Sequence, residues 1–204
     1  MQRLLVATGN LGKLSEIQSL LDGIRISLLT PDRIGVNLQV EETGNSYEEN
    51  ASLKAHAFAH ASGLITMADD SGLEVDALAG QPGIRSARFS PLQDATDADR
   101  RAFLLDLLRD HTRPWKAHFH CTVAIVTPED KIYFAQGNCP GEVIPEERGT
   151  NGFGYDPIFL LNDVGLTMAE LSMNEKNCLS HRARAVKAAI PILLAIFQIQ
   201  STSS

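Results

Sequence analysis

The chain has few cysteines, no long hydrophobic run and fewer basic than acidic residues. Its three cysteines are Cys121, Cys139 and Cys178, an odd number without paired metal-ligand spacing, which argues against a disulfide framework. A reducing cytoplasm fits this pattern better. The sequence starts on a strand-like segment, without a basic region and a long apolar core, and no apolar run reaches bilayer length. We therefore expect neither a signal peptide nor a membrane span.

The charge balance restricts the partners. With 18 Lys and Arg against 25 Asp and Glu, the net charge is −7, which argues against a broad surface for nucleic acid or for an anionic membrane. A polyanionic substrate would then need a local positive site, which Lys13, Lys54, Lys176 and Arg182 could supply. A hydrophobic content of 44% is typical of a globular protein, and 204 residues suit one large domain or two closely packed lobes.

Strands alternate with helices along the chain, which predicts an α/β protein. The apolar periodicities and turn signals place a hairpin around Thr127-Pro128-Glu129-Asp130 and a long loop over 79–93. The expected strands cover 3–8, 25–29, 64–69, 118–126, 131–137, 141–145 and 157–161. The expected helices cover 12–22, 46–62, 73–78, 96–110 and 180–197, followed by a polar tail, 198–204.

Two adjacent acids, Asp69 and Asp70, follow the apolar strand Leu64–Ala68. Carboxylates cost free energy at the end of a buried strand unless hydrogen bonds or a metal satisfy them. If the strand continues through them, they point to opposite faces. Carboxylate oxygens are natural ligands of Mg²⁺. The alternative is an acidic turn with Ser71 and Gly72 that caps the next element.

The segment Thr8-Gly9-Asn10-Leu11-Gly12-Lys13 lies between an apolar strand and a helix-like pattern. A strand, a small-residue turn and a helix start present backbone N–H groups to an anion, and Lys13 adds a cation. The spacing matches neither the P-loop nor the dinucleotide fingerprint. An ordinary turn between a strand and a helix is the alternative.

Near the C-terminus, two further clusters suggest recognition of a base. Phe153 lies between Gly152 and Gly154, so its ring could be presented from a loop as a stacking platform, with Asp156 as an acceptor for ring N–H groups. The alternative is a tight turn that places Phe153 and Tyr155 in the core. His181-Arg182 follows Ser180 at an expected helix start, where cations are disfavoured, which suggests that an anion or an oxo group offsets them.

In their joint order, these segments resemble the inosine triphosphate/xanthosine triphosphate pyrophosphatase family of nucleotide-pool sanitising enzymes, over residues 1 to about 197. The resemblance implies hydrolysis of deaminated purine triphosphates, namely ITP, dITP and XTP, to the monophosphate and pyrophosphate, and a homodimer. We expect one catalytic domain, 1–197, a two-lobed α/β fold around a long mixed sheet flanked by helices, with the active-site cleft between the lobes. The segments that carry the resemblance are Thr8-Gly9-Asn10 with Lys13, Glu41-Glu42-Thr43-Gly44, Ala68-Asp69-Asp70-Ser71-Gly72-Leu73, Pro82-Gly83-Ile84 with Ser86-Ala87-Arg88, Phe153-Gly154-Tyr155-Asp156-Pro157 and Ser180-His181-Arg182.

The residue chemistry is consistent with that activity. Asp70 is the expected catalytic residue, and Glu41 and Asp70 are the expected ligands of Mg²⁺, with Glu42 and Asp69 as further candidates. His181 and Arg182 can donate to the six-oxo group that adenine lacks. The expected substrate-binding residues are Thr8, Gly9, Asn10, Leu11, Gly12, Lys13, Lys54, Ser71, Phe153, Gly154, Tyr155, Asp156, Lys176, His181 and Arg182.

Three other functions fit parts of the sequence. A nucleotide-binding regulatory domain without turnover would gain little from several acids near phosphates. An acidic interaction protein would use the same clusters as capped turns. A pyrophosphatase for modified pyrimidines is the closest rival, and the pairing of Phe153 and Asp156 with His181 and Arg182 favours an oxopurine instead. A metal-dependent turnover assay separates an enzyme from the regulatory domain and from the interaction protein.

Overall fold

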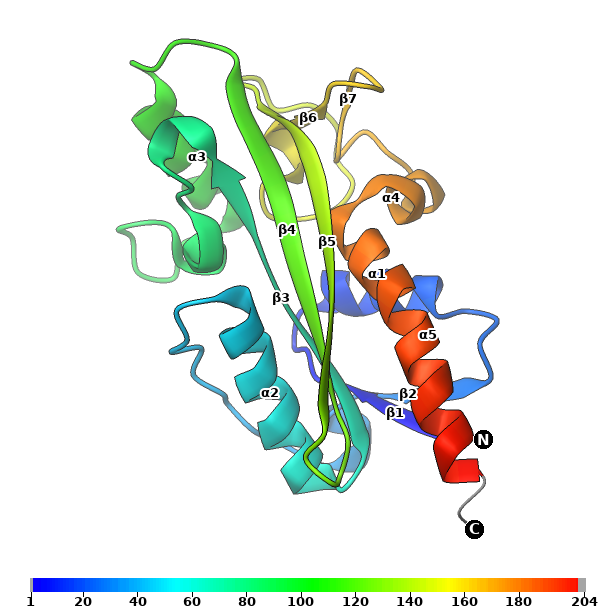
Figure 1. The fold of residues 1–204 in the computed structure, drawn as a ribbon. Coiled ribbons are helices and arrows are strands. Elements are labelled where there is room, and N and C mark those ends of the chain that lie inside the picture. Colours follow the sequence, from blue (N-terminus) through cyan, green and yellow to red (C-terminus); the bar gives the residue numbers. More distant parts are fainter. Residues whose placement is uncertain (1, 202–204) are drawn as a thin grey trace. The chain divides into compact units, whose positions relative to one another are not determined.

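The computed structural model describes residues 2–201, in which seven strands form one sheet in the order β2-β1-β3-β4-β5-β6-β7 (Figure 1). β1 pairs in parallel with β2 and β3, whereas β6 pairs antiparallel with β5 and β7. The expected mixed sheet of an α/β protein is therefore confirmed. The strands are β1 (Gln2–Val6), β2 (Ile26–Leu29), β3 (Ile65–Val75), β4 (Trp115–Val126), β5 (Ile132–Val143), β6 (Phe159–Leu161) and β7 (Leu166–Thr167).

The helices begin and end at local signals in the sequence. The side chain of Ser46 accepts a hydrogen bond from the Glu49 N–H at the start of α2, and Gly63, with φ +64°, ends that helix. Thr96 and Asp99 form a capping box at the start of α3. No helix within residues 2–201 is long and apolar enough to cross a membrane. The helices are α1 (Leu11–Leu20), α2 (Tyr47–Ser62), α3 (Asp97–Leu108), α4 (Met173–Leu179) and α5 (His181–Ser201).

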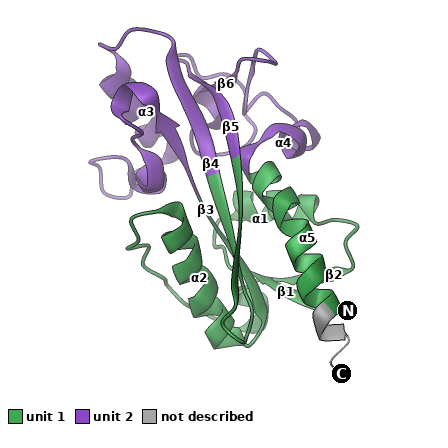
Figure 2. Ribbon diagram, viewed as in Figure 1, with its two compact units in different colours: residues 1–70, 121–137, 182–204 green, residues 71–120, 138–181 purple. Residues whose placement is uncertain are grey.

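The chain divides into two compact units (Figure 2). Unit 1 contains residues 1–70, 121–137 and 182–204, and unit 2 contains residues 71–120 and 138–181. The strands β3, β4 and β5 each contribute residues to both units. Among the described residues, the buried apolar side chains form two clusters in unit 1 and one in unit 2.

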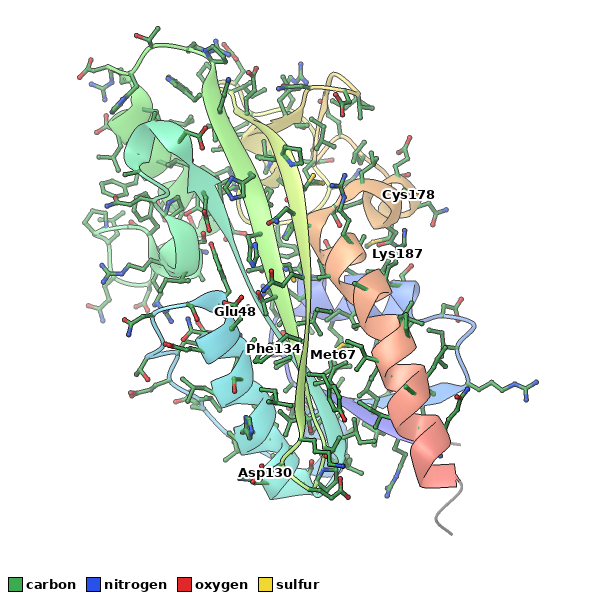
Figure 3. All side chains as sticks on the ribbon, in the orientation of Figure 1. Glu48, Met67, Asp130, Phe134, Cys178 and Lys187 are labelled. Carbon is green, nitrogen blue, oxygen red and sulfur yellow. The ribbon has the colours of Figure 1, made fainter. Side chains whose placement is uncertain are left out.

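Unit 1 has apolar residues on both faces of its part of the sheet. Along β1, Leu4 and Val6 pack into a core shared with α1 and α5, whereas Leu5 packs into a second core shared with α2. This alternation is the period of two of a strand that is covered on both faces. Met67 of β3, labelled in Figure 3, is fully buried in the first of these cores.

Unit 2 has one core. Leu73 and Val75 of β3 pack there with Leu104 and Leu108 of α3, and all four side chains are fully buried. This packing corrects one prediction, because the segment 73–78 is not a helix. β3 continues to Val75, and a 3-10 turn, Asp76–Leu78, follows it. The strand continues because its alternate apolar side chains have a core to enter, which the local sequence does not reveal.

Other boundaries also differ from expectation. The strand expected at 141–145 is the end of β5, while β7 and α4 were not expected. The long loop 79–93 contains a 3-10 helix, Gly83–Arg88. α5 continues to Ser201, beyond the expected end at 197, so residues 198–201 belong to this helix, and residues 202–204 of the expected tail lie outside the described residues.

Candidate functional site

The two acids of unit 1 lie within β3 and point to opposite faces, as expected for a continuing strand. Asp69 contacts α1 and α5 through Lys13 and Arg182, whereas Asp70 contacts α2 through Asn50. Both carboxylates are buried, with 2% and 5% of their residue surface exposed. The acids therefore stand in two different environments, one on each side of the same strand.

Asp69 is held by two cations. Its Oδ2 atom lies 3.0 Å from Lys13 Nζ and accepts a hydrogen bond from Arg182 Nε at 3.2 Å. Arg182 also donates from Nη1 to Oε2 of Glu16 at 2.5 Å, and both of these side chains are buried. Burial alone would raise the pKa of Asp69, but Lys13, Arg182 and Lys54 together lower it below its ordinary value. Asp69 is therefore an ionised anchor.

Asp70 has neutral and more distant partners. Asn50 Nδ2 donates to its Oδ2 at 3.1 Å, and Lys54 Nζ lies 3.9 Å from its Oδ1. Burial raises the pKa of Asp70, and Lys54 and Lys13 offset this only in part. Neighbouring carboxyls with opposite pKa shifts mark candidates for acid–base chemistry. Of the two acids, Asp70 is therefore the one suited to accept a proton.

Lys54 is surrounded by oxygen atoms. Its Nζ atom donates to Glu42 Oε1 at 2.7 Å and to the Asp69 carbonyl oxygen at 2.5 Å. Burial would lower the pKa of Lys54, but the charges of Asp69, Asp70 and Glu42 raise it above its ordinary value. Carboxylate and carbonyl oxygens are the donors that Mg²⁺ takes in proteins, so the chemistry of this set fits a divalent cation.

The described residues do not converge into a complete metal site. No group of three or more His, Cys, Asp and Glu side chains within residues 2–201 is arranged to hold a metal ion. Glu41, an expected ligand, is exposed, while its neighbour Glu42 is the acid that pairs with Lys54. The ligand roles of Glu41 and Asp70 stay predictions.

The turn before α1 has the expected form. Asn10 is the N-cap, and its side chain accepts from the Lys13 N–H at 3.0 Å, while Thr8 Oγ1 accepts from the Asn10 N–H at 3.1 Å. Gly9 and Leu11 are exposed, and Gly12 is half-buried. Lys13 itself pairs with Asp69, so the helix start and the acid pair belong to one cluster.

Unit 2 holds the second cluster, around Phe153. Lys176 Nζ donates to Asp156 Oδ2 at 2.6 Å and lies 5.0 Å from the centre of the Phe153 ring. The Phe153 N–H donates to the same Asp156 oxygen at 2.9 Å. Phe153 is half-buried, whereas Asp156 and Lys176 are buried. An aromatic face, a cation and an acceptor are thus assembled on one loop and α4.

Other predicted site residues have structural contacts. Tyr155 is buried in the core of unit 2 and donates its hydroxyl to the Ser86 carbonyl oxygen at 2.9 Å, as in the tight-turn alternative. The His181 ring stacks on Phe119 at a centroid distance of 4.6 Å. Ser71 is half-buried on β3. The substrate-binding roles of these residues stay predictions.

Sequence reasoning missed several residues that support these clusters. Glu16 lies three residues after Lys13 on α1, a helical spacing that could have indicated a shared face. Asparagine is disfavoured inside a helix, so Asn50 in the first turns of α2 could have indicated a specific contact. Besides its bond to Asp70, it accepts a hydrogen bond from the Gly44 N–H at 2.8 Å. Asp97 and Arg101 contact the loop at Gly154, a contact that no local pattern indicates.

Comparisons with known proteins identify the family. A "dITP/XTP pyrophosphatase" of Geobacter sulfurreducens is 45% identical over 186 residues, which cover 91% of this chain and 94% of that relative. Another of that name from Escherichia coli O157:H7 is 43% identical over 196 residues, covering 95% and 98%. The structure of a HAM1 protein from Coxiella burnetii matches with a TM-score of 0.87 at 38% identity, covering 96% of this chain and all of that one. A family model described as the Ham1 family matches residues 4–192, and the chain therefore belongs to the Ham1 family.

Proposed function

We propose that this protein hydrolyses deaminated purine nucleoside triphosphates, ITP, dITP and XTP, to the monophosphate and pyrophosphate. The names of the curated relatives support this substrate class. The observation that carries the chemistry is the pair Asp69 and Asp70, adjacent acids of β3 in different surroundings: Asp69 is bound by Lys13 and Arg182, whereas Asp70 is bound by Asn50 and lies 3.9 Å from Lys54. Burial accordingly raises the pKa of Asp70. An enzyme that activates water needs a base, and a binding domain gains little from several acids near phosphates.

In the proposed reaction, a water oxygen forms a bond to the α phosphorus. The bond from the α phosphorus to the α–β bridging oxygen breaks, and pyrophosphate leaves with that oxygen. Asp70 takes up the proton of the attacking water, a task for which its raised pKa makes it a better base than an ordinary aspartate. Asp69 stays ionised and fixes Lys13.

The phosphates require cations and N–H donors. We assign them to Lys13, Lys54 and Lys176, with Asn10 and Ser71 as neutral donors. The turn residues Thr8, Gly9, Leu11 and Gly12 would present backbone N–H groups at the start of α1. Mg²⁺, held by Glu41 and Asp70, would supply further neutralisation of phosphate charge. Glu42 is the alternative ligand, because its carboxylate and that of Asp70 lie 2.7 Å and 3.9 Å from Lys54 Nζ.

The base is assigned to the loop of unit 2. Phe153 would stack on the purine, Asp156 would accept from ring N–H groups, and Gly154 and Tyr155 would shape the loop. His181 and Arg182 are proposed to donate to the six-oxo group, although the contacts of Arg182 with Glu16 and Asp69 also favour an indirect role through Asp69. The expected active-site cleft stays a prediction.

The assembly and location are proposals as well. We propose a cytoplasmic homodimer, for which the family resemblance is the support, with Pro82 to Phe89 as a candidate contact segment. Light scattering during size-exclusion chromatography measures the mass in solution. A mass of one chain across the working concentration range would exclude the dimer.

The deciding experiment measures products. With ITP and Mg²⁺, we expect inosine monophosphate and pyrophosphate in equal amounts, ATP turned over far more slowly, and no turnover after Mg²⁺ is removed by a chelator. Diphosphate and orthophosphate as the first products would refute attack at the α phosphorus. A preference for modified pyrimidine triphosphates would favour the rival pyrophosphatase.

A further inference from the structure

Helix α3 binds the backbone of the Phe153 loop at Gly154, through contacts that lie wholly within unit 2. The Gly154 N–H donates to Asp97 Oδ2 at 2.7 Å, and the Gly154 carbonyl oxygen accepts from Arg101 Nη1 at 2.8 Å. Asp97 and Arg101 are four residues apart on α3, so they share one face of the helix. Hydrogen bonds with an ionised partner are about twice as strong as neutral ones.

Asp156, three residues after Phe153 in the same loop, binds the neighbouring peptide groups. Its Oδ2 atom accepts from the Phe153 N–H at 2.9 Å, and its own N–H donates to the Phe153 carbonyl oxygen at 3.2 Å. Hydrogen bonds therefore hold three consecutive peptide groups: the one before Phe153, the one between Phe153 and Gly154, and the one after Gly154. These three planes fix the backbone torsions of both residues, and so the direction from which the Phe153 ring leaves the chain.

The loop needs external support because of its glycines. Gly152 and Gly154 have φ of +77° and +62°, in the left-handed region. Glycine adopts many other conformations as readily, so the two glycines do not by themselves keep the Phe153 ring in one place. If the ring becomes ordered only when a ligand binds, the cost of ordering it lowers the affinity and the selectivity for that ligand. A preorganised ring avoids this cost.

The two α3 residues are themselves anchored. Arg101 makes a second, bidentate contact with Glu147, from Nε at 2.8 Å and from Nη2 at 3.0 Å. Asp97 Oδ1 accepts from Arg100 Nη2 at 2.5 Å. Partial burial would raise the pKa of Asp97, but the bonds from Arg100 and from the Gly154 N–H lower it below its ordinary value, so the acceptor stays ionised at neutral pH.

We propose that Asp97 and Arg101 are positioning residues that hold Gly154 on both sides, fix the Phe153 ring, and thereby set the discrimination between oxopurine and adenine nucleotides. The selectivity part rests on the proposed function. The holding of the loop does not, because it is a property of the free protein and can be measured without substrate.

The test compares two alanine variants in the first turn of α3. Asp97→Ala removes the acceptor of the Gly154 N–H. Asp99→Ala removes the carboxylate whose Oδ2 atom accepts from the Thr96 N–H at 2.8 Å. Both lose an acid at the helix N-terminus, so Asp99→Ala is the matched control for weakening of the helix. Amide hydrogen exchange is measured on the peptide containing Phe153 to Tyr155, and kcat/KM is measured for ITP and ATP on both variants and on the unaltered chain.

We expect Asp97→Ala to speed exchange in this segment at least about tenfold over Asp99→Ala, the scale of one lost charged hydrogen bond. We also expect the ITP-to-ATP selectivity to fall about tenfold in Asp97→Ala and to stay near normal in Asp99→Ala. If Asp97→Ala does not fold, Arg101→Lys replaces it, because lysine lacks the planar fork whose three nitrogens reach Glu147 and Gly154.

Each outcome decides a part of the proposal. Equal exchange in the two variants would overturn the holding of the loop by α3. Faster exchange with unchanged selectivity would overturn the link to base discrimination. If the unaltered chain itself does not hydrolyse ITP, the proposed function fails, while the exchange data still decide whether α3 holds the loop.

Discussion

Replacing Arg182 by methionine removes a cation that two buried carboxylates share in unit 1. Arg182 is 1% exposed, and its guanidinium donates to Glu16 at 2.5 Å and to Asp69 at 3.2 Å. Methionine keeps much of the volume but leaves the two acids without this charge, although Asp69 retains Lys13. Removing one partner of a buried ion pair costs about 3–5 kcal/mol. For a chain of this size, that is roughly a 6–20 °C drop in Tm at roughly 2–4 °C per kcal/mol.

The assay is urea unfolding of the Arg182→Met chain at several pH values. Burial favours the protonated form of a carboxyl that has lost its counter-charge, so the folded variant takes up protons more readily than its unfolded chain does. Because the folded variant binds protons more readily than its unfolded chain, its free energy of unfolding increases as pH falls. The loss of stability relative to the unaltered chain should therefore shrink between pH 8 and about pH 5. Adding Glu16→Gln should restore part of the loss, since it removes one of the stranded charges.

Arg109→Met is the matched control, because Arg109 pairs with Asp106 on the exposed surface of α3 and such pairs contribute little. A loss of less than about 1 kcal/mol in Arg182→Met, or a loss that grows as pH falls, would refute the reasoning.

The same variant tests base recognition. A direct donor to the six-oxo group should lower efficiency on ITP by about one to two decades more than on ATP, whereas action through Asp69 should lower both alike. Because Arg182 is proposed as a donor to the six-oxo group, we expect the selective loss on ITP, and equal losses would assign Arg182 an indirect role through Asp69.

Two further substitutions test the assigned roles. Asp70→Asn should lower turnover at least ~10²-fold. Because burial raises the pKa of Asp70, its charged form costs folding free energy at neutral pH, so the metal-free variant should equal or exceed the unaltered chain in stability at pH 7, by a margin that vanishes below about pH 4. Near-normal turnover in a folded variant would move the base elsewhere, with Asp69 and Glu41 next. Lys176→Ala should raise KM for ITP and ATP alike with little change in kcat, and a selective loss on ITP would assign Lys176 to the base.

The sequence by itself determined the features that depend on neighbours within a few residues. The apolar run before Thr8 and the N-cap Asn10 define β1 and the start of α1, and Ser46 and Gly63 delimit α2. Each of these signals is a hydrogen bond or a backbone preference that acts over one turn. The order of the motifs along the chain likewise indicated the family.

Only the tertiary structure decided what surrounds the two acids. Whether β3 stops at Asp69 or runs to Val75 depends on the core that receives Leu73 and Val75, and that core is built from distant segments. The partners that separate the two carboxyls are also distant in the chain, with Arg182 113 positions from Asp69 and 166 from Glu16. A charge in a buried environment is governed by the nearest opposite charges in space. Local patterns cannot supply those, so the sequence could name Asp69, Asp70 and Arg182 but not their pairing.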